Sequence, residues 1–159
     1  MILLKPNHLW EGEKTGRNPV DRGKIGTKKS ILTDGAGIPI GIAIHSSSQH
    51  DATTLDEVLD GSWISSFPKE TVIYFDKGYD SEHIREAFHF LGIKVIIPRR
   101  HKRAGRQHKL GKKRWQVERT FSWLNRFKQV RTRTAKKVEN YLAILQLAAS
   151  WITLKKVLG

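Results

Sequence analysis

The chain has 159 residues, of which 38% are hydrophobic and 28% are charged. This is enough apolar material for the core of one compact domain but hardly for two. Lysine and arginine outnumber the acidic residues by 29 to 15, the net charge is +14, and there is no cysteine. These properties exclude a disulfide framework and a thiolate zinc site, and they favour a polyanionic partner such as nucleic acid.

The positive charge is concentrated in one part of the chain. Between Lys94 and Lys137 the sequence holds seventeen basic residues and a single acidic one, Glu118, whereas the rest is close to neutral. Such a run is either a nucleic-acid contact or a solvated face, and charge alone does not separate the two. No signal peptide is recognisable, and no apolar stretch approaches the roughly twenty residues of a membrane span. We therefore expect a soluble, cytoplasmic protein with no membrane partner.

The N-terminal part is expected to form an arm. Residues 10–29 carry glycine, an Asn-Pro pair and many charges without an apolar period, which is typical of an extended loop with little packing. The sequence therefore predicts an arm over residues 1–29 and a folded core over residues 30–159.

A hairpin and a short helix are predicted next. From Ser30, two β-branched runs flank the pair Asp34-Gly35, a pattern typical of a β-hairpin. Asp51 then stands where an N-terminal cap is expected. The apolar residues that follow it at helical spacing are Leu55, Val58 and Leu59.

Strands and helices alternate in the second half. A β-former run over residues 71–75 ends at Asp76, and residues 94–97 form another short strand. The helix between them, ended by Gly92, has its apolar face at Ile84, Ala87, Phe88 and Leu91. A basic loop over residues 99–113 precedes two amphipathic helices. Their stripes are Val117, Phe121, Leu124 and Phe127, continued by Trp123 and Val130, and then Leu142, Leu145, Ala149 and Ile152. This order predicts an α/β fold, a mixed β-sheet flanked by helices.

Asp76 and Glu118 are the candidate chemical groups. Asp76 follows a strand, where ligand sites gather in sheets of this kind, but it could simply end the strand while Asp80 or Ser81 caps the next helix. Glu118 lies at the edge of an apolar stripe and can face a cleft, or it can pair with Arg114 one turn earlier. Carboxylates bind hard divalent cations, which suits phosphodiester chemistry. The histidines show neither a metal-ligand spacing nor the pattern of a serine triad.

Seven segments of the sequence form one ordered set of motifs. They are residues 13–22, 26–30, 34–39 and 50–51, then Asp76-Lys-Gly-Tyr-Asp80, Ile97-Pro-Arg-Arg100 and residues 114–126. In order and spacing, this set resembles the middle of insertion-sequence transposases of the Asp-Asp-Glu (DDE) type. The resemblance covers residues 12–158 and implies a ribonuclease H-like fold. It also implies metal-dependent DNA cleavage and strand transfer with Mg²⁺ or Mn²⁺.

The resemblance carries site residues over one at a time. It places the second family aspartate at Asp76 and the family glutamate at Glu118, both as catalytic metal ligands. The signature arginine four residues earlier is Arg114, whereas a lysine often found seven residues after the glutamate is Asn125 here. The first family aspartate should precede residue 13, yet residues 1–10 contain no acidic side chain. We therefore expect the first strand to be missing or atypical, and we hypothesise that a frameshift or truncation left it encoded upstream.

The implied partner is double-stranded DNA, both the element ends and the target, bound by a homo-oligomer at the bacterial nucleoid. Phosphate contacts are expected from Arg99, Arg100, Lys102, Arg103, Lys112, Lys113, Arg114, Arg119 and Arg126. Trp115 and Trp123 are expected to pack rather than to stack on bases. Two alternatives stay open: a catalytically dead DNA-binding fragment that regulates transposition, and a ribonuclease H-like endonuclease without a transfer step.

Overall fold

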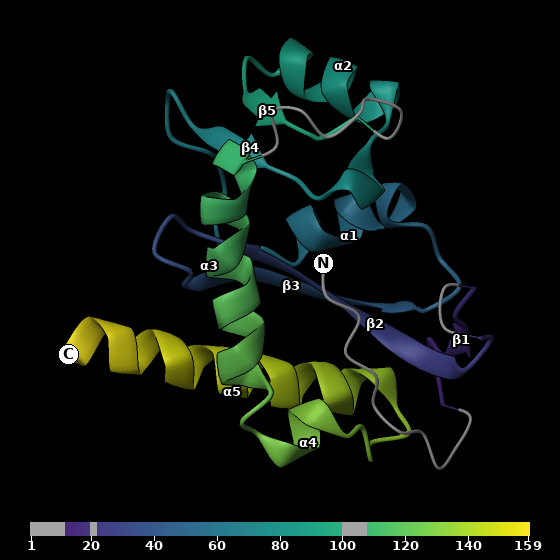
Figure 1. Ribbon diagram of the computed structural model, residues 1–159. Coiled ribbons are helices and arrows are strands. Elements are labelled where there is room, and N and C mark those ends of the chain that lie inside the picture. Colours follow the sequence, from purple (N-terminus) through teal and green to yellow (C-terminus); the bar gives the residue numbers. More distant parts are fainter. Residues whose placement is uncertain (1–11, 20–21, 100–107) are drawn as a thin grey trace.

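The computed structural model of the chain describes residues 12–19, 22–99 and 108–159, with side chains described from residue 115 onward in the last segment. Strands and helices alternate around two small sheets (Figure 1). In chain order the elements are β1 (Gly16–Arg17), β2 (Ile25–Thr33), β3 (Pro39–Ser46), the 3₁₀ segment η1 (Asp51–Thr54), α1 (Leu55–Asp60), β4 (Val72–Tyr74), the 3₁₀ segment η2 (Lys77–Tyr79), α2 (Glu82–Phe90), β5 (Lys94–Ile96), α3 (His108–Leu124), α4 (Lys128–Arg131) and α5 (Val138–Leu158).

The predicted hairpin is formed by β2 and β3. The two strands pair antiparallel, and β1 adds a short third strand at the start of β2. Asp34 closes the turn as the sequence indicated, because its Oδ1 accepts the backbone N–H groups of Ala36 and Ile38, both at 2.8 Å. Gly37 has a φ of 82°, a conformation that glycine adopts without strain.

Strand β2 extends into the residues that were expected to form an arm. β2 begins at Ile25, five residues before the predicted hairpin, and Thr27, Lys28 and Lys29 are buried. The buried ammonium of Lys29 donates to the Val130 carbonyl at 3.1 Å, and that of Lys28 donates to Asp51 Oδ1 at 2.6 Å. These partners allow both lysines to lie buried in a strand. The boundary proposed at residue 29 stays a prediction.

A buried arginine ties the N-terminal segment to the C-terminal half. Arg133 donates to the carbonyl of Glu13 at 2.9 Å and to Thr27 Oγ1 at 2.6 Å. It also donates to the carbonyls of Ala135 and Lys136. One guanidinium therefore satisfies four acceptors at once, and segments more than one hundred residues apart are held together.

A second, separate sheet contains β4 and β5. These strands pair in parallel, with Val72 opposite Lys94 and Tyr74 opposite Ile96. The buried face of α2, which carries Ile84 and Phe88, packs on this sheet in a cluster with Ile73. Both predicted strands are confirmed, and the mixed α/β class holds, but the strands of the described residues form two sheets rather than one.

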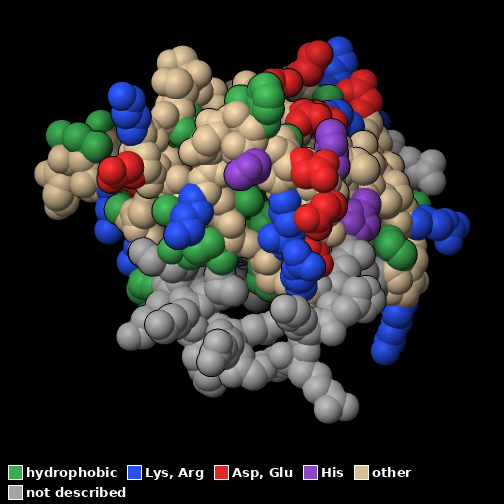
Figure 2. Space-filling model, turned by 90° about the horizontal axis from the view of Figure 1, so that it is seen from above, with side chains coloured by type: hydrophobic (Ala, Val, Ile, Leu, Met, Phe, Trp, Pro, Cys, Tyr) green, Lys and Arg blue, Asp and Glu red, His purple; other side chains and the backbone are tan. Residues whose placement is uncertain are grey.

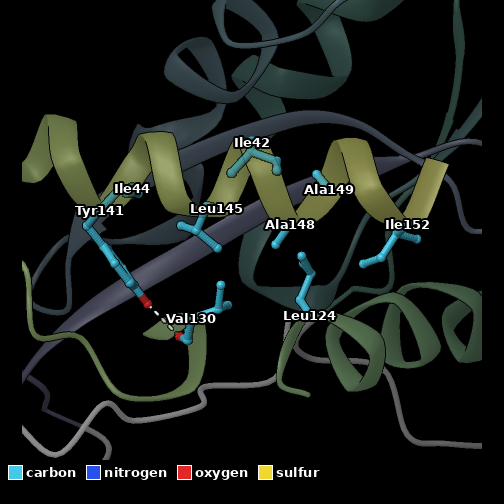
Figure 3. Packing of buried hydrophobic residues seen from close by; sticks show 9 residues of the cluster. All are labelled: Ile42, Ile44, Leu124, Val130, Tyr141, Leu145, Ala148, Ala149 and Ile152. Carbon is cyan, nitrogen blue, oxygen red and sulfur yellow. Dashed lines mark hydrogen bonds between the residues drawn. The ribbon is translucent and has the colours of Figure 1, made fainter. Parts of the chain in front are cut away.

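The larger core lies between the hairpin and α5. Leu124, Val130, Tyr141 and Leu145 are fully buried there, and the Tyr141 hydroxyl donates to the Val130 carbonyl at 2.7 Å (Figure 3). The figure shows the labelled side chains of α5 directed toward Val130 and Leu124. Figure 1 shows α5 at one end of the molecule, the β4–β5 sheet at the other, and α3 running between them.

Several local expectations are corrected. The cap before η1 is His50, whose side chain accepts the Ala52 N–H, and not Asp51. Leu91 follows α2 and is exposed, because the buried face of that short helix ends at Phe88. Part of the predicted basic loop is helical, since α3 begins at His108. A further short helix, α4, separates α3 from α5, and Phe127 occupies its N-cap position without a side-chain hydrogen bond.

Helix α5 corrects the expectation that no apolar stretch approaches the length of a membrane span. By length and composition this helix is long enough to cross a membrane, with a mean hydropathy of 1.3. Its two sides differ, because Leu145 is fully buried whereas Leu147 is 74% exposed.

The core position of Leu145 predicts a large effect of truncation. Leu145→Ala should lower the free energy of unfolding by about 2–5 kcal/mol, because the tightly packed cluster cannot fully close over the cavity. Urea unfolding followed by circular dichroism measures this change. Gln146→Ala, at the exposed neighbouring position, is the control and should leave the midpoint almost unchanged. Equal midpoints for the two variants would contradict the described packing.

Burial of Lys29 predicts a pH-dependent stability. Burial lowers the pKa of Lys29 from 10.5 to about 8. Between these values the unfolded chain binds a proton that the folded chain does not, so the unfolding free energy rises with pH. The wild-type value minus that of Lys29→Met should therefore increase from pH 8 to pH 10, by at most about 1.4 kcal/mol per pH unit. A difference that stays constant in urea titrations across this range would refute the assignment.

Candidate active site

Asp76 and Glu118 line one cavity, although they belong to opposite parts of the sequence. The cavity has a volume of about 710 Å³ and is bounded by β2, α1, β4 and α3. Its walls are largely apolar and include Leu55, Ile73 and Phe121. The two carboxylates that the sequence singled out therefore line the same cavity. Their catalytic role stays a prediction.

Asp76 is held at the end of β4 by its own turn. Its Oδ1 accepts the backbone N–H of Lys77 at 2.7 Å, so it caps η2. The capping role considered for Asp80 is not realised, because Asp80 instead accepts from Arg85 Nη2 at 2.7 Å. Ser81 occupies the cap position of α2 without a side-chain hydrogen bond. Asp76 therefore both caps η2 and lines the cavity.

An aromatic cluster anchors the turn that carries Asp76. Tyr79 is buried, and its ring centroid lies 5.3 Å from that of Phe75, which in turn lies 5.5 Å from Phe88. Burial raises the pKa of the Tyr79 hydroxyl, with smaller contributions from the negative charges of Asp51 and Asp76. The turn thus has apolar support from β4 and α2.

A buried ion pair supports the same turn from the other side. Lys28 Nζ lies 2.6 Å from Asp51 Oδ1, and both side chains are at least 87% buried. A Cβ atom on Gly78 would collide with Asp51 Oδ2, so the carboxylate and the turn are in direct contact. Asp51 had been considered as a cleft carboxylate; it instead pairs with Lys28 and packs beneath η2.

Glu118 is positioned by the docking of α3 on the hairpin turn. Thr120, buried on α3, donates to the Gly37 carbonyl, and Arg119 Nη2 donates to the Ala36 carbonyl at 2.6 Å. Glu118 lines the cavity together with Val117 and Phe121 of the same helix. Its own side chain is exposed, and it forms no ion pair with any residue that the structure describes. The side chain of Arg114 lies outside the described residues, so that alternative stays open.

A third carboxylate does not join the pair within the described part of the chain. No group of three potential metal ligands occurs among those residues. Asp34 lines the cavity, but its Oδ1 is occupied by the turn, and Asp51 is paired with Lys28. Mg²⁺ is commonly bound through one or two carboxylates together with water and phosphate oxygens, so the donor atoms of Asp76 and Glu118 are of the kind that such an ion takes.

The predicted phosphate-binding residues fall into three groups. Arg99 and Arg126 are exposed. Arg119 is partly buried, and its guanidinium lies 4.6 Å from the Trp115 ring and 5.0 Å from the Trp123 ring. The remaining side chains lie outside the described residues: Arg100, Lys102, Arg103, Lys112, Lys113 and Arg114. Both tryptophans therefore pack on Arg119, although Trp115 is still 55% exposed.

The surface charge is not uniform. Figure 2 views the molecule from the end where α2 lies, and it shows acidic side chains gathered in one group on this face, among scattered basic ones. A polyanion is repelled by such a group. DNA is thus expected to bind elsewhere than at this acidic group.

Two comparisons place the chain among known proteins. The family described as Transposase DDE domain matches residues 5–152. The chain belongs to the DDE transposase family. A Burkholderia cepacia protein assigned as the transposase for insertion sequence element IS402 is 35% identical to this DDE transposase over 156 residues, which is 92% of the chain and 73% of that relative. No solved structure matches the chain. The predicted family is confirmed, and with it a general role in DNA transposition.

The Lys28–Asp51 pair predicts strong coupling between two substitutions. Lys28→Met should lower the unfolding free energy by about 3–5 kcal/mol, because it leaves the Asp51 carboxylate buried without a partner. The double variant Lys28→Met/Asp51→Leu should be more stable than Lys28→Met alone, since neither charge remains. Urea unfolding of the wild type, both single variants and the double variant measures the coupling. Additive losses would show that the pair does not hold the turn.

Proposed function

We propose that this DDE transposase cleaves DNA at element ends and transfers the strand in a metal-dependent reaction, with Asp76 and Glu118 as the metal-holding carboxylates. The observation that carries the proposal is their position on the wall of one cavity. The two residues come from different parts of the fold: Asp76 caps η2, and Glu118 lies on α3, whose backbone is fixed by its docking on the hairpin turn.

The protein's contribution is to hold charge in a fixed place. A divalent cation such as Mg²⁺ or Mn²⁺, when bound, activates a nucleophile and stabilises the oxygen that leaves phosphorus. Asp76 and Glu118 would hold this charge at the wall of a cavity whose lining is largely apolar. The backbone positions of both residues are fixed by the fold, which reduces the rearrangement needed when DNA arrives.

We propose further that the third carboxylate comes from a strand encoded outside this chain and seated in the same cavity. Strands β2 and β4 line the cavity but belong to different sheets. The cavity is partly open, since Val72 and Tyr74 in its wall are exposed. An open hollow of about 710 Å³ lined by strands of two sheets is consistent with a site for another strand.

The basic residues would supply affinity for double-stranded DNA, at the element ends and at the target. Contacts to phosphate release counterions, so binding should weaken steeply with salt. The setting of this activity would be the bacterial nucleoid, with the enzyme acting as a homo-oligomer. One observation favours a second candidate for the chain by itself: within the described residues no third carboxylate joins Asp76 and Glu118. A DNA-binding fragment that regulates transposition would need none.

A strand-cleavage assay tests the proposal. The chain is tested alone and fused to the polypeptide encoded immediately upstream, with element-end duplexes and Mg²⁺ or Mn²⁺. We expect cleavage by the fused form, reduced by two orders of magnitude or more in Asp76→Asn and in Glu118→Gln, because each variant removes a metal ligand. Glu139→Gln, an exposed position on α5, is the matched control and should keep full activity.

The outcomes separate the candidate functions. Cleavage that survives both site variants would refute the proposed site. Salt-sensitive DNA binding without cleavage, in both forms of the protein, would favour the regulatory fragment. Cleaved products without joined ends would indicate an endonuclease rather than a strand-transfer enzyme.

A further inference from the structure

Helix α5 has two apolar faces, and only one of them is used within the chain. The buried face packs on the hairpin and on α3 and α4 through Tyr141, Leu145, Ala148, Ala149 and Ile152. The other face carries large apolar side chains that remain in solvent. They are Leu147, Trp151, Leu154 and Leu158, with exposed fractions of 74%, 51%, 47% and 76%.

The spacing of this exposed face is that of a coiled-coil seam. Leu147, Trp151, Leu154 and Leu158 follow one another at intervals of four, three and four residues. The half-buried Ile144, which also packs against the core cluster, extends the same row by three residues toward the N-terminus. Alternating steps of three and four residues keep side chains on one stripe that faces a partner helix. A row of large apolar side chains at this spacing has no role on a helix face that stays in solvent. We therefore expect another helix to cover it.

The size of the stripe fits self-association. Contiguous apolar patches of about 300–600 Å² on a monomer mark interaction sites, and side chains exposed by half to three-quarters over three helical turns fall in this range. Two such stripes facing each other bury on the order of 1,000 Å², which is the lower limit for a specific interface. Figure 1 shows the C-terminal half of α5 extending beyond α3, where a second helix can approach.

We propose that α5 is a homodimer interface in which this stripe packs antiparallel against the same stripe of a second copy. A two-fold axis between Leu147 and Trp151 sets each of these residues opposite the other in the partner, and it sets Ile144 opposite Leu154. Large residues then face smaller ones, which packs more evenly than Trp151 against Trp151. The arrangement is self-complementary, as two-fold symmetry requires.

The helix dipoles favour the same orientation. An antiparallel pair sets the two α5 dipoles against each other, whereas a parallel pair aligns them. Lys155 and Lys156 lie at the C-terminal end of α5, Glu139 lies in its first turn, and the exposed Lys136 and Lys137 precede the helix. Both ends of α5 therefore carry positive charge, and the preference for the antiparallel pair rests on the dipoles and on the packing of large against smaller side chains.

The apolar character of α5 does not require a lipid partner. A helix that crossed a membrane would have to withdraw Tyr141, Leu145 and Ile152 from the core cluster. Arg133 would also lose the Tyr141 ring, which lies 5.3 Å from its guanidinium. The exposed stripe is the part of α5 that binds without disturbing the fold.

Light scattering after size-exclusion chromatography tests the interface. The full chain is measured without DNA or metal, in high salt and over a wide range of concentrations. We expect twice the mass of one chain at high concentration, and a single-chain mass for Trp151→Glu and for Leu154→Glu. Gln146→Glu, an exposed position off the stripe, should leave the dimer intact. Circular dichroism confirms that each variant is folded.

Disulfide trapping tests the orientation, since the chain contains no cysteine of its own. The double variant Ile144→Cys/Leu154→Cys should form a crosslinked dimer on oxidation, because these positions face each other in the antiparallel pair. Leu154→Cys alone should not, and efficient crosslinking of this single variant would show a parallel pair.

Three results would overturn the proposal. The first is a single-chain mass at every concentration, which would show that the stripe does not bind a second copy. The second is a dimer that persists in Trp151→Glu. The third is a monomer that cosediments with lipid vesicles through Trp151. The measurements involve neither cleavage nor metal, so their failure leaves the proposed catalytic function untouched, and loss of that function leaves the dimer untouched.

Discussion

The docking of α3 on the turn of the β2–β3 hairpin is the contact on which the candidate site depends. Arg119 and Thr120 donate to the carbonyls of Ala36 and Gly37, and these bonds join segments 83 residues apart. Glu118 precedes them directly, so its side chain is placed beside the cavity. This docking, together with the buried Phe121 and Leu124, fixes α3 beside β2, which lines the same cavity as β4. Hydrogen bonds to backbone acceptors thus create a site that neither element contains alone.

The other half of the site is stabilised mainly from within the core. Asp76 sits on a turn supported by Tyr79 and by the buried Lys28–Asp51 pair. A buried ion pair adds little net stability compared with apolar residues, but it is costly to break, so it specifies one position for the turn. A rigid turn is an advantage where a carboxylate must meet a ligand without rearrangement. Polar groups that pack beneath the site therefore matter as much as those that face it.

Much of the fold and of the site was predictable from particular residues. Asp34-Gly35 predicted the hairpin turn, and the β-former run before Asp76 predicted β4, because turn chemistry and local propensity act over a few residues. Asp76 and Glu118 were recognised through motifs, and the structure brings them to one cavity. The buried state of Lys28 and Lys29 was not predictable, since charged residues read as loop unless their distant partners, Asp51 and Val130, are known. The split into two sheets and the second apolar face of α5 likewise depend on contacts between distant segments.

The central claim is that Asp76 and Glu118 share one divalent cation. Nuclear magnetic resonance with Mn²⁺ tests this claim most directly, because the ion broadens the signals of nearby backbone amides. Substoichiometric Mn²⁺ should broaden the amides around residues 76–78 and 117–119 together, and either Asp76→Asn or Glu118→Gln should abolish both effects. Broadening of one region that persists when the other carboxylate is removed would contradict a shared ion.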